Sequence, residues 1–324
     1  MNKNLSILSR YQPELEKINE KLEQVLSNVN GVGRDIKSYA VLSEGKRIRP
    51  LLFVLVSKAL GFNSLEIYEQ STVYELIHTA SLMHDDVLDN ADLRRNKPTV
   101  NSIWGNHMAV LCGDNLYLTA LEIALRTKNL EYVRMLIESV KEMTEGQILE
   151  LENFMNLELT KEVYLKIITK KTGSLIAAAC KGAAILGNAN QELRTRLYHA
   201  GMYMGTAFQM VDDLLDITGR TQELGKEIGK DLMEGKVTLP LIYLLERLEG
   251  RHSSWFKSAL KEGISKEFVR EISTKIVDQG IREKVLEEAR ELSQKAKAIL
   301  ETLPPSPEKE GLLELNSFIV VRRY

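Results

Sequence analysis

Two groups of aspartates share one spacing and follow apolar stretches: Asp85-Asp86-Val87-Leu88-Asp89 and Asp212-Asp213-Leu214-Leu215-Asp216. Residues four apart lie on one face of an α-helix, so the first and last aspartate of each group present their carboxylates to a common point. Crowded carboxylates repel one another, and hard divalent cations with oxygen ligands relieve that repulsion. Because Mg2+ keeps several waters and is completed by phosphate oxygens, the pattern predicts a magnesium site for a phosphorylated or diphosphorylated ligand.

Basic residues that would offset this acidic charge stand beside glycines or expected helix ends: Lys46, Arg49, Arg94, Arg95, Lys171, Lys226 and Lys236. Arginine binds phosphate oxygens as a bidentate fork, whereas lysine supplies a movable point charge. Any one of them alone is most often a surface residue, but as a group they favour recognition of phosphates. His78 lies two helical turns before Asp85 on the same helix face and belongs with this group.

The second acidic stretch carries uncharged residues on the face of Asp212. Gly201, Gly205 and Phe208 share that face, and Gln209 lies at its margin. The two glycines leave room either for tight helix packing or for a substrate, and the sequence favours neither use. Phe208 taken by itself is most often a core residue.

The composition limits the class of protein. The chain has 324 residues, 44% of them hydrophobic, which suffices for a substantial core. A formal net charge of -2 argues against nucleic-acid binding, which needs a dominant basic surface. Cys112 and Cys180 lie in apolar stretches and fit the reduced core thiols of a cytoplasmic protein. Since no signal-peptide core and no run of about 18 uncharged apolar residues occur, no transmembrane segment is expected, although peripheral membrane contact stays open.

Helical periodicity dominates the chain, and proline is absent between Pro98 and Pro240. Helices are expected from Pro13 to before Asn30, from Pro50 to about Gly61, from about Ser64 to the first aspartates, over residues 107–127, 130–156, 161–187, 191–218, 238–249, 253–262, 265–279 and 281–302, and after Pro307. Strand signals are scarce. No linker is long or polar enough to divide the chain, so residues 1–324 are expected to form one all-α domain.

Five separated motifs resemble those of the trans-isoprenyl diphosphate synthase, or polyprenyl synthetase, family: Gly45–Pro50, His78–Arg95, Lys171–Gly173, Gly205–Asp216 and Gly225–Pro240. The resemblance runs in order through most of the chain and is to the medium- and long-chain type that makes heptaprenyl and octaprenyl diphosphate. It implies a single large helical bundle around a deep central cavity, the isoprenoid synthase type I fold, as a homodimer or as a heteromer with a small regulatory subunit. Two residues depart from the pattern: Asn96 replaces a common Gly, and Glu150 replaces an Asp of some short-chain relatives.

The resemblance also implies a role for each matching residue. Asp85, Asp89 and Asp212 would hold three Mg2+ ions on the diphosphate of an allylic substrate such as farnesyl or geranylgeranyl diphosphate. The residues implied to grip the same diphosphate are Arg94, Lys171, Lys226 and Lys236. Those implied to bind isopentenyl diphosphate are Lys46, Arg49, His78 and Arg95, with Phe208 against its hydrocarbon part. Thr172 and Gln209 would direct their dipoles at the allylic cation, and the terminal Arg322-Arg323-Tyr324 would close over isopentenyl diphosphate.

The implied reaction adds isopentenyl diphosphate head to tail to an allylic diphosphate, in repeated cycles. The growing tail would run away from the first aspartates along their own helix, past Ser81, Ala80, Ile77 and Val73. These four side chains cluster in one sector of the helix and are small next to the aspartates, which predicts an all-trans product of roughly thirty to fifty carbons, as used for quinone side chains. The lower stop is expected on the 107–127 helix.

Four other functions compete with this interpretation. A short-chain farnesyl or geranylgeranyl diphosphate synthase differs only in product length. A class I terpene cyclase shares the first aspartate group but needs no pocket for a second diphosphate, so Lys46, Arg49 and His78 speak against it. The His84-Asp85 pair would suit a metal-dependent phosphohydrolase, although histidines are few. A non-catalytic partner subunit would be expected to have lost its aspartates, and both groups are intact.

Overall fold

The computed structural model describes residues 9–27, 31–43, 45–219, 229–248, 256 and 263–321. Across these ranges the only strands are β1 (Leu93–Arg94) and β2 (Lys97–Pro98), and nearly everything else with regular structure is helical. The predicted all-α fold class is confirmed.

The chain forms two compact units. Unit 1 comprises Met1–Val140, Leu175–Gly201 and Ala298–Leu315, and unit 2 comprises Lys141–Ser174, Met202–Lys297 and Asn316–Tyr324. That residues 1–324 act as a single domain stays a prediction.

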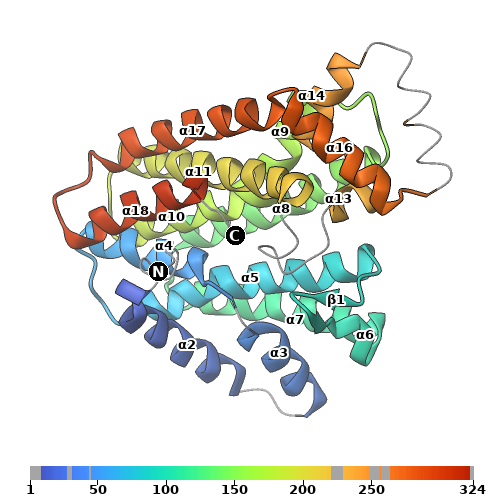
Figure 1. The fold of residues 1–324 in the computed structure, drawn as a ribbon. Coiled ribbons are helices and arrows are strands. Elements are labelled where there is room, and N and C mark those ends of the chain that lie inside the picture. The colour runs from blue at the N-terminus through green and yellow to red at the C-terminus, as the bar shows by residue number, and fades with distance from the viewer. Residues whose placement is uncertain are drawn as a thin grey trace. The chain divides into compact units, whose positions relative to one another are not determined.

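Unit 1 is built around helix α5 (Glu66–Leu88). Five other helices of its N-terminal part are α2 (Gln12–Ser27), α3 (Val32–Leu42), α4 (Ile48–Ala59), α6 (Val100–Trp104) and α7 (Asn106–Leu125). All five pack against α5, and α7 runs alongside it over most of its length (Figure 1). The core between α4 and α5 includes Phe53 and Tyr74, whose ring centroids lie 5.2 Å apart. Because α5 is covered on several sides, most of its residues are buried, including polar ones such as Gln70 and Glu75, and its end is held in one place.

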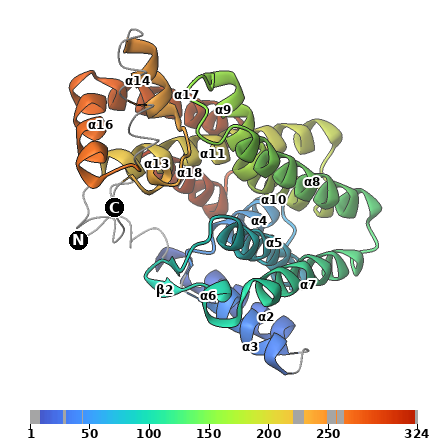
Figure 2. The same ribbon diagram turned by 90° about the vertical axis from the view of Figure 1, so that its right-hand side faces the viewer.

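Unit 2 and the remaining helices follow in chain order. They are α8 (Leu130–Glu152), α9 (Lys161–Ile168), the π-helical turn η1 (Thr169–Gly173), α10 (Ser174–Leu186), α11 (Gln191–Thr218), α13 (Lys230–Met233), α14 (Leu239–Arg247), α16 (Lys266–Asp278), α17 (Ile281–Leu300) and α18 (Pro307–Val321). Within unit 2, α14 packs on both α9 and α16, as Figure 2 shows for α14 and α16. The edge-to-face pair of Phe256 and Phe268, 5.1 Å between centroids, forms part of that core.

The short hairpin after α5 fixes the two arginines of the first motif. Leu93 pairs with Pro98 and Arg94 with Lys97, which leaves Arg95 and Asn96 as a two-residue turn. Both turn residues are left-handed, with φ of 51° and 61°, as a type I′ hairpin requires. Asn tolerates this conformation better than most residues. The departure from Gly at position 96 is therefore compatible with the turn, and it keeps both arginines in place.

The expected helices are mostly confirmed in place and differ at their ends. The 191–218 helix is found with the expected bounds, and those expected at 107–127, 130–156, 265–279 and 281–302 end one to four residues away from the expectation. Pro50 is not the first helical residue, because α4 begins at Ile48 and Pro50 is its third residue. The first turn of a helix leaves its N–H groups without intrahelical acceptors, so proline is accepted there as well. The expected helix at 253–262 lies outside the described residues, apart from Phe256.

Besides the β1–β2 hairpin and α13, further elements were not expected from the sequence. Helix α3 is short and weakly apolar, and α6 is a single turn capped by the Thr99 side chain, which accepts from the Ser102 N–H at 3.3 Å. The expected 161–187 helix is interrupted by the π turn at Thr169–Gly173. A π turn keeps the helical hydrophobic pattern almost unchanged, which hides it from periodicity.

Helix α7 is the single helix in the described ranges that is long and apolar enough to cross a membrane by length and composition. It nevertheless carries Asp114 and Glu122 and packs against α3, α5 and α6. A helix that lies partly in a protein core passes the same test, so this property does not by itself indicate a membrane span.

Candidate active site

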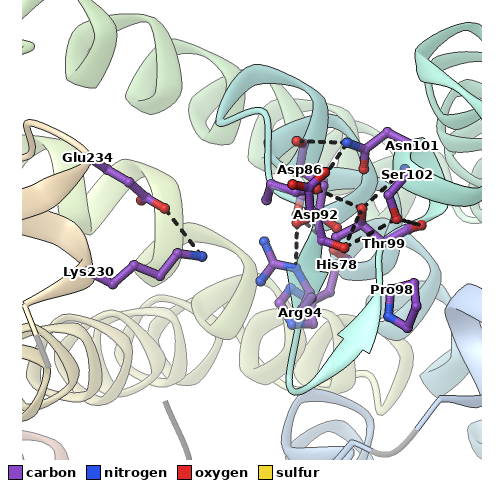
Figure 3. Close-up of polar contacts among 12 residues, drawn as sticks. His78, Asp86, Asp92, Arg94, Pro98, Thr99, Asn101, Ser102, Lys230 and Glu234 are labelled. Carbon is purple, nitrogen blue, oxygen red and sulfur yellow. Dashed lines mark hydrogen bonds and ion pairs between the residues drawn. The ribbon is translucent and has the colours of Figure 1, made fainter. Parts of the chain in front are cut away.

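The first aspartate group ends helix α5 in unit 1. Asp85 and Asp89 are half-buried, whereas Asp86 is buried. Arg94 donates its Nε to Asp86 Oδ1 at 2.8 Å, and Figure 3 shows this ion pair between the helix end and the hairpin. Asp86 thus anchors an arginine of the first motif. Asp85 and Asp89 are the two aspartates of the first group that are half-buried at the surface of unit 1.

The face of α5 next to Asp85 is held by α7. The His84 Nε2 lies 3.2 Å from the Val110 carbonyl oxygen and 3.4 Å from Asp114 Oδ1. Burial and the nearby charges of Asp85 and Asp114 raise the pKa of Tyr117. The His84 imidazole therefore contacts residues of α7. This contact removes the main argument for a phosphohydrolase site at the His84-Asp85 pair.

The basic loop before α4 is arranged around a buried ion pair. Arg47 has φ 49°, its Nη1 lies 2.6 Å from Glu75 Oε1, and its Nη2 donates to the Val41 carbonyl at 2.6 Å. Both charged side chains are 8% exposed. A Cβ placed at Gly45 would lie 3.1 Å from Arg47 Nη1 and 3.4 Å from Arg95 Nη1, so the loop passes close to both guanidiniums. Arg47 therefore holds the loop in shape.

Arg49, His78 and Arg95 form one electrostatic group in unit 1. Burial lowers the pKa of Arg49 to about 10, Glu75 opposes that shift and Arg95 adds to it. The Arg49 Nε is buried and finds no hydrogen-bond acceptor within the described residues. Burial, followed by the charges of Arg49, Arg95, Arg94 and Arg47, lowers the pKa of His78 well below its usual value. An anion would be attracted to this group, where a neutral imidazole and a buried N–H donor are available. Lys46 is exposed on the same loop.

The four predicted chain-length residues lie on α5 before the aspartates. Val73, Ile77 and Ala80 are fully buried, and Ser81 is half-buried with its Oγ donating to the His78 carbonyl at 2.8 Å. They follow one sector of the helix, as expected. Their role in product length stays a prediction.

In unit 2, the π turn carries Lys171 and Thr172. Its backbone approaches α8 and α11 closely, because a Cβ at Gly146 would lie 2.7 Å from the Lys171 nitrogen and one at Gly173 would lie 2.7 Å from Met202 Sδ. Neither distance is possible for a real side chain without movement. The glycines therefore allow the turn to be held between its neighbours, and such turns are frequent at functional sites.

A chain of hydrogen bonds links the π turn to the second aspartate group. Thr172 Oγ1 donates to Gln209 Oε1 at 2.9 Å, and Gln209 Nε2 donates to Asp213 Oδ1 at 2.7 Å. The Tyr164 hydroxyl donates to Asp213 Oδ2 at 2.6 Å. Burial raises the pKa of Asp213 to about 7, and the two donors act in the opposite direction. The network brings together Thr172 and Gln209, the two residues implied to face the allylic cation.

A cavity of about 120 Å³ lies beside this network in unit 2. Its lining includes Lys171, Thr172, Gln209 and Lys236 from the predicted site, together with Glu150, Tyr164, Asp213 and Asp231. Lys171 Nζ lies 2.6 Å from Glu150 Oε2, and Lys236 Nζ lies 2.9 Å from Glu234 Oε2. The two lysines are thus directed by carboxylates at the cavity that they line.

The second aspartate group is used differently from the first. Asp212 is half-buried, but Asp216 is buried and its Oδ2 accepts from the Asp231 N–H at 3.1 Å, while its carbonyl accepts from the Gly229 N–H at 2.7 Å. Figure 3 also shows Lys230 paired with Glu234, with 3.2 Å between Nζ and Oε1. Asp216 therefore ties α11 to the segment around α13. One Asp216 oxygen is thus used within the protein, and the expectation that Asp212 and Asp216 present their carboxylates to a common point stays a prediction.

Other predicted site residues are placed less tightly. Phe208 is half-buried on α11. The packing alternative holds for Gly201, because a Cβ there would lie 2.6 Å from the Ala177 Cα, which is tight helix packing. Lys226 and Arg322-Arg323-Tyr324 lie outside the described residues.

The chain matches the polyprenyl synthetase family model over residues 33–276. It belongs to the polyprenyl synthetase family. The octaprenyl diphosphate synthase of Haemophilus influenzae is 35% identical over 313 residues, covering 96% of this chain and 95% of that protein. The heptaprenyl diphosphate synthase component 2 of Bacillus subtilis is 33% identical over 316 residues, covering 96% and 88%. A polyprenyl synthase from Caulobacter crescentus, solved with calcium and isoprenyl diphosphate, matches with a TM-score of 0.91 at 31% identity, covering 98% and 97%.

These matches confirm the resemblance and the expectation of a prenyl-transferring enzyme. The carboxylates of this polyprenyl synthetase also suit the metal that the sequence implies. Among the described residues, no three acidic, histidine or cysteine side chains converge as a preformed cage. Half-buried Asp85, Asp89 and Asp212 offer oxygen ligands in incomplete sets, which suits Mg2+ because that ion keeps water and takes substrate phosphate as further ligands.

The sequence did not predict several residues of the cavity in this family member, among them Tyr164, Glu150 and Asp213. Tyr164 lies in the buried stripe of α9 with Ile167 and Ile168, and it resembles an ordinary core residue. In the sequence, Glu150 stands out only as a departure from the family pattern. Asp213 stands out only as one of the regularly spaced aspartates. The bond between Tyr164 and Asp213 joins residues 49 positions apart, and a single sequence carries no local signal for it.

Proposed function

We propose that this chain is a Mg2+-dependent trans-polyprenyl diphosphate synthase. It adds isopentenyl diphosphate head to tail to an allylic diphosphate, such as farnesyl or geranylgeranyl diphosphate, and makes an all-trans product of roughly thirty to fifty carbons that would serve as a quinone side chain. The observation that carries the proposal is the pattern of aspartate exposure in a polyprenyl synthetase. Asp85, Asp89 and Asp212 have half-buried carboxylates, whereas Asp86, Asp213 and Asp216 are buried and bonded to protein groups.

The charged residues support binding of two diphosphates at different sets of side chains. Arg94, Lys171 and Lys236, with Lys226, would grip the allylic diphosphate, and each of the first three is already directed by a carboxylate. The group of Arg49, His78 and Arg95, with exposed Lys46, would bind isopentenyl diphosphate. Phe208 would contact the hydrocarbon part of that substrate. Mg2+ at Asp85, Asp89 and Asp212 would supply positive charge to the leaving diphosphate.

The chemistry follows from this charge distribution. Arginine and lysine side chains stabilise the negative charge that develops on the departing diphosphate as the allylic C–O bond breaks. The resulting cation faces the oxygen dipoles of Thr172 and Gln209, and the double bond of isopentenyl diphosphate attacks it to form the new C–C bond. A proton then leaves the adjacent carbon and passes to the released diphosphate. Water must be excluded while the cation exists, which requires closure over the substrates.

An elongation assay tests the proposal directly. The purified chain is incubated with Mg2+, farnesyl or geranylgeranyl diphosphate and labelled isopentenyl diphosphate, and the products are sized after removal of the diphosphate. We expect a ladder that ends at roughly thirty to fifty carbons and depends on both substrates. Products that stop at fifteen or twenty carbons would identify a short-chain synthase, and hydrocarbons made without isopentenyl diphosphate would identify a cyclase. An allylic diphosphate left intact in magnesium would contradict the proposal.

We also propose that the enzyme is a homodimer through the exposed apolar side of α7. Leu111, Leu118 and Leu125 recur at seven-residue steps on that helix and are 63%, 65% and 55% exposed. A row of exposed leucines at helical spacing is typical of a surface that a partner covers. The double substitution Leu111→Glu and Leu118→Glu should convert a dimer into monomers in light scattering. Leu65→Glu is the control, since Leu65 is 76% exposed and lies outside α7.

A second subunit is the alternative assembly, and the B. subtilis relative, named as a component 2, motivates testing it. Activity of the purified chain alone would exclude that requirement.

The two cysteines, Cys112 and Cys180, are both buried and free, which supports a reducing cytoplasmic location. Peripheral membrane contact for release of the apolar product belongs to the same proposal and predicts co-sedimentation with vesicles after turnover.

A further inference from the structure

We propose that Tyr164 is a positioning residue that acts through Asp213 to fix the direction of the Gln209 amide at the reacting carbon. This inference rests on the proposed function, in which Thr172 and Gln209 face the allylic cation. It concerns two residues, Tyr164 and Asp213, that the motifs of the family resemblance do not explain.

The first step is the orientation of Asp213. The Tyr164 hydroxyl lies 2.6 Å from one carboxylate oxygen, and the Gln209 amide lies 2.7 Å from the other. Tyr164 is 2% exposed and Asp213 5%, so water does not compete for these bonds. Burial and the Asp213 charge raise the pKa of Tyr164 well above its usual value, so its hydroxyl keeps its proton and donates. Each oxygen of Asp213 is therefore fixed by a different donor.

The second step is the direction of the Gln209 side chain. The Gln209 amide nitrogen faces Asp213 and donates to it, which is the direction that an ionised carboxylate, an acceptor only, requires. The amide oxygen then points to Thr172, whose hydroxyl donates to it at 2.9 Å. The Thr172 proton and one amide hydrogen are thereby used inside the protein. Both residues line the cavity, and each of their side-chain oxygens keeps at least one lone pair that these bonds do not use.

The third step is the frame that holds Thr172. Thr172 belongs to the π turn, where Thr169 Oγ1 lies 3.3 Å from Thr206 Oγ1 on α11 and Gly173 allows close packing against Met202. With the backbone fixed, only the side-chain amide of Gln209 can reverse. A reversed amide would present N–H groups, the positive end of its dipole, to a developing cation. Transition-state stabilisation would then become repulsion, since oriented dipoles act on the charge that forms.

Tyr164→Phe tests the first step, because it removes one oxygen and keeps the ring. We expect kcat to fall by about 10- to 100-fold, as is typical when a partner that orients a site group is lost, while KM for both diphosphates changes less than about twofold. Tyr243→Phe is the matched control. The Tyr243 hydroxyl donates to Glu288 in the same unit, Tyr243 is 3% exposed, and it does not line the cavity. The Tyr243→Phe variant should lower the melting temperature about as much as Tyr164→Phe does, and it should leave kcat unchanged.

A polarity swap tests the second step. In Asp213→Asn the introduced amide would donate to Gln209 and reverse it, and in Gln209→Glu two carboxylates would face each other. Each single variant should lose activity. The double variant Asp213→Asn with Gln209→Glu restores one donor and one acceptor with unchanged net charge, and Tyr164 can still donate to the amide oxygen introduced at position 213. Its kcat should exceed the product of the two single effects by at least about tenfold.

The outcomes separate this inference from the proposed function. If the unmodified chain makes no prenyl product, the proposed function fails. If the unmodified chain is active, a Tyr164→Phe variant with unchanged kcat, a Tyr243→Phe variant with an equal loss, or a swap without rescue overturns the positioning role. Should Tyr164→Phe fail to fold, the swap decides alone, because it leaves Tyr164 in place.

Discussion

The two aspartate groups have identical spacing and different surroundings. At the end of α5, Asp85 and Asp89 are half-buried and only Asp86 is buried, in an ion pair with Arg94. On α11 the proportion is reversed. Asp212 alone is half-buried, while Asp213 and Asp216 are buried and bonded to a tyrosine, an amide and backbone N–H groups.

The difference shows how one motif can serve two purposes. Helical spacing places carboxylates on one face, but the neighbouring elements decide how deeply each of them is buried. The first group ends its helix and leaves two carboxylates at the surface. The second lies inside its helix, and buried donors use its later members. We infer that the first group supplies most of the metal ligands and that the second mainly holds its surroundings in place.

The largest effect is expected where both groups act alike. Asp85→Ala and Asp212→Ala should each lower kcat/KM by at least about 10³-fold, because several kcal/mol of charge stabilisation are lost with the metal. Elongation assays over a range of Mg2+ concentrations measure this. Asp92→Ala is the control, since Asp92 is exposed just beyond the first group. Full activity of either variant would contradict a metal role for that residue.

The next effect separates the last members of the two groups. Asp216→Ala should lower the free energy of unfolding by about 1–3 kcal/mol, because the part-buried Asp231 N–H loses its acceptor. Asp89→Ala, at the equivalent position of the first group, should change stability by less than about 0.5 kcal/mol while it reduces activity. Urea unfolding without magnesium measures both. Equal stability of the two variants would show that the groups are used in the same way.

Product length offers a third comparison between the two acidic helices. Ala80 and Ala207 each lie five residues before the first aspartate of their group, and both are fully buried. If the tail grows along α5, Ala80→Tyr should shift the products to shorter chains, because the ring would block the path next to the aspartates. Ala207→Tyr should leave the length distribution unchanged, whatever it does to the rate. Overpacking costs each variant about 1–3 kcal/mol, so both are assayed below their unfolding temperature. An unchanged distribution in Ala80→Tyr would refute this path.

The positions of the two aspartate groups on their helices could be predicted from the sequence far better than the role of each aspartate. Apolar periodicity without proline was enough to find the 191–218 helix, because a helix pattern of that length has few alternatives. The metal-ligand assignment to Asp212 alone came from the family resemblance and stays a prediction. Nothing local distinguishes Asp213 from Asp86, since burial and hydrogen-bond partners come from residues distant in the chain. The role of Tyr164 was hidden for the same reason, whereas the π turn was hidden because it keeps the helical hydrophobic pattern.

A smaller effect is expected from the carboxylates that hold basic residues beside each group. Lys171 pairs with Glu150, whose side chain is 23% exposed, whereas Arg94 pairs with the more buried Asp86. Glu150→Gln removes a competitor for the Lys171 charge. We expect KM for the allylic diphosphate to fall by up to about fivefold, because partly exposed ion pairs are worth about 1 kcal/mol or less.

Glu145→Gln is the control for this prediction, since it removes the neighbouring and more exposed pair with Lys170. It should leave KM unchanged. Asp86→Asn should instead raise KM, because Arg94 would lose the partner that directs it. A higher KM in Glu150→Gln would show that the lysine needs its carboxylate for orientation, as the arginine does.

The smallest effect is a pH dependence of stability that belongs to the first region. Burial and the neighbouring guanidiniums lower the pKa of His78 well below its usual 6.5. Above pH 6.5 the imidazole is neutral in both folded and unfolded chains, and it contributes no pH dependence. As the pH falls below 6.5 the unfolded chain takes up the proton first, so the free energy of unfolding should decrease by up to about 1.4 kcal/mol per pH unit until the folded pKa is reached. His78→Gln should remove this part of the slope in urea titrations between pH 7.5 and 5.5. A slope that persists in the variant would place the responsible group elsewhere and would leave the neutral imidazole beside Arg49 and Arg95 without support.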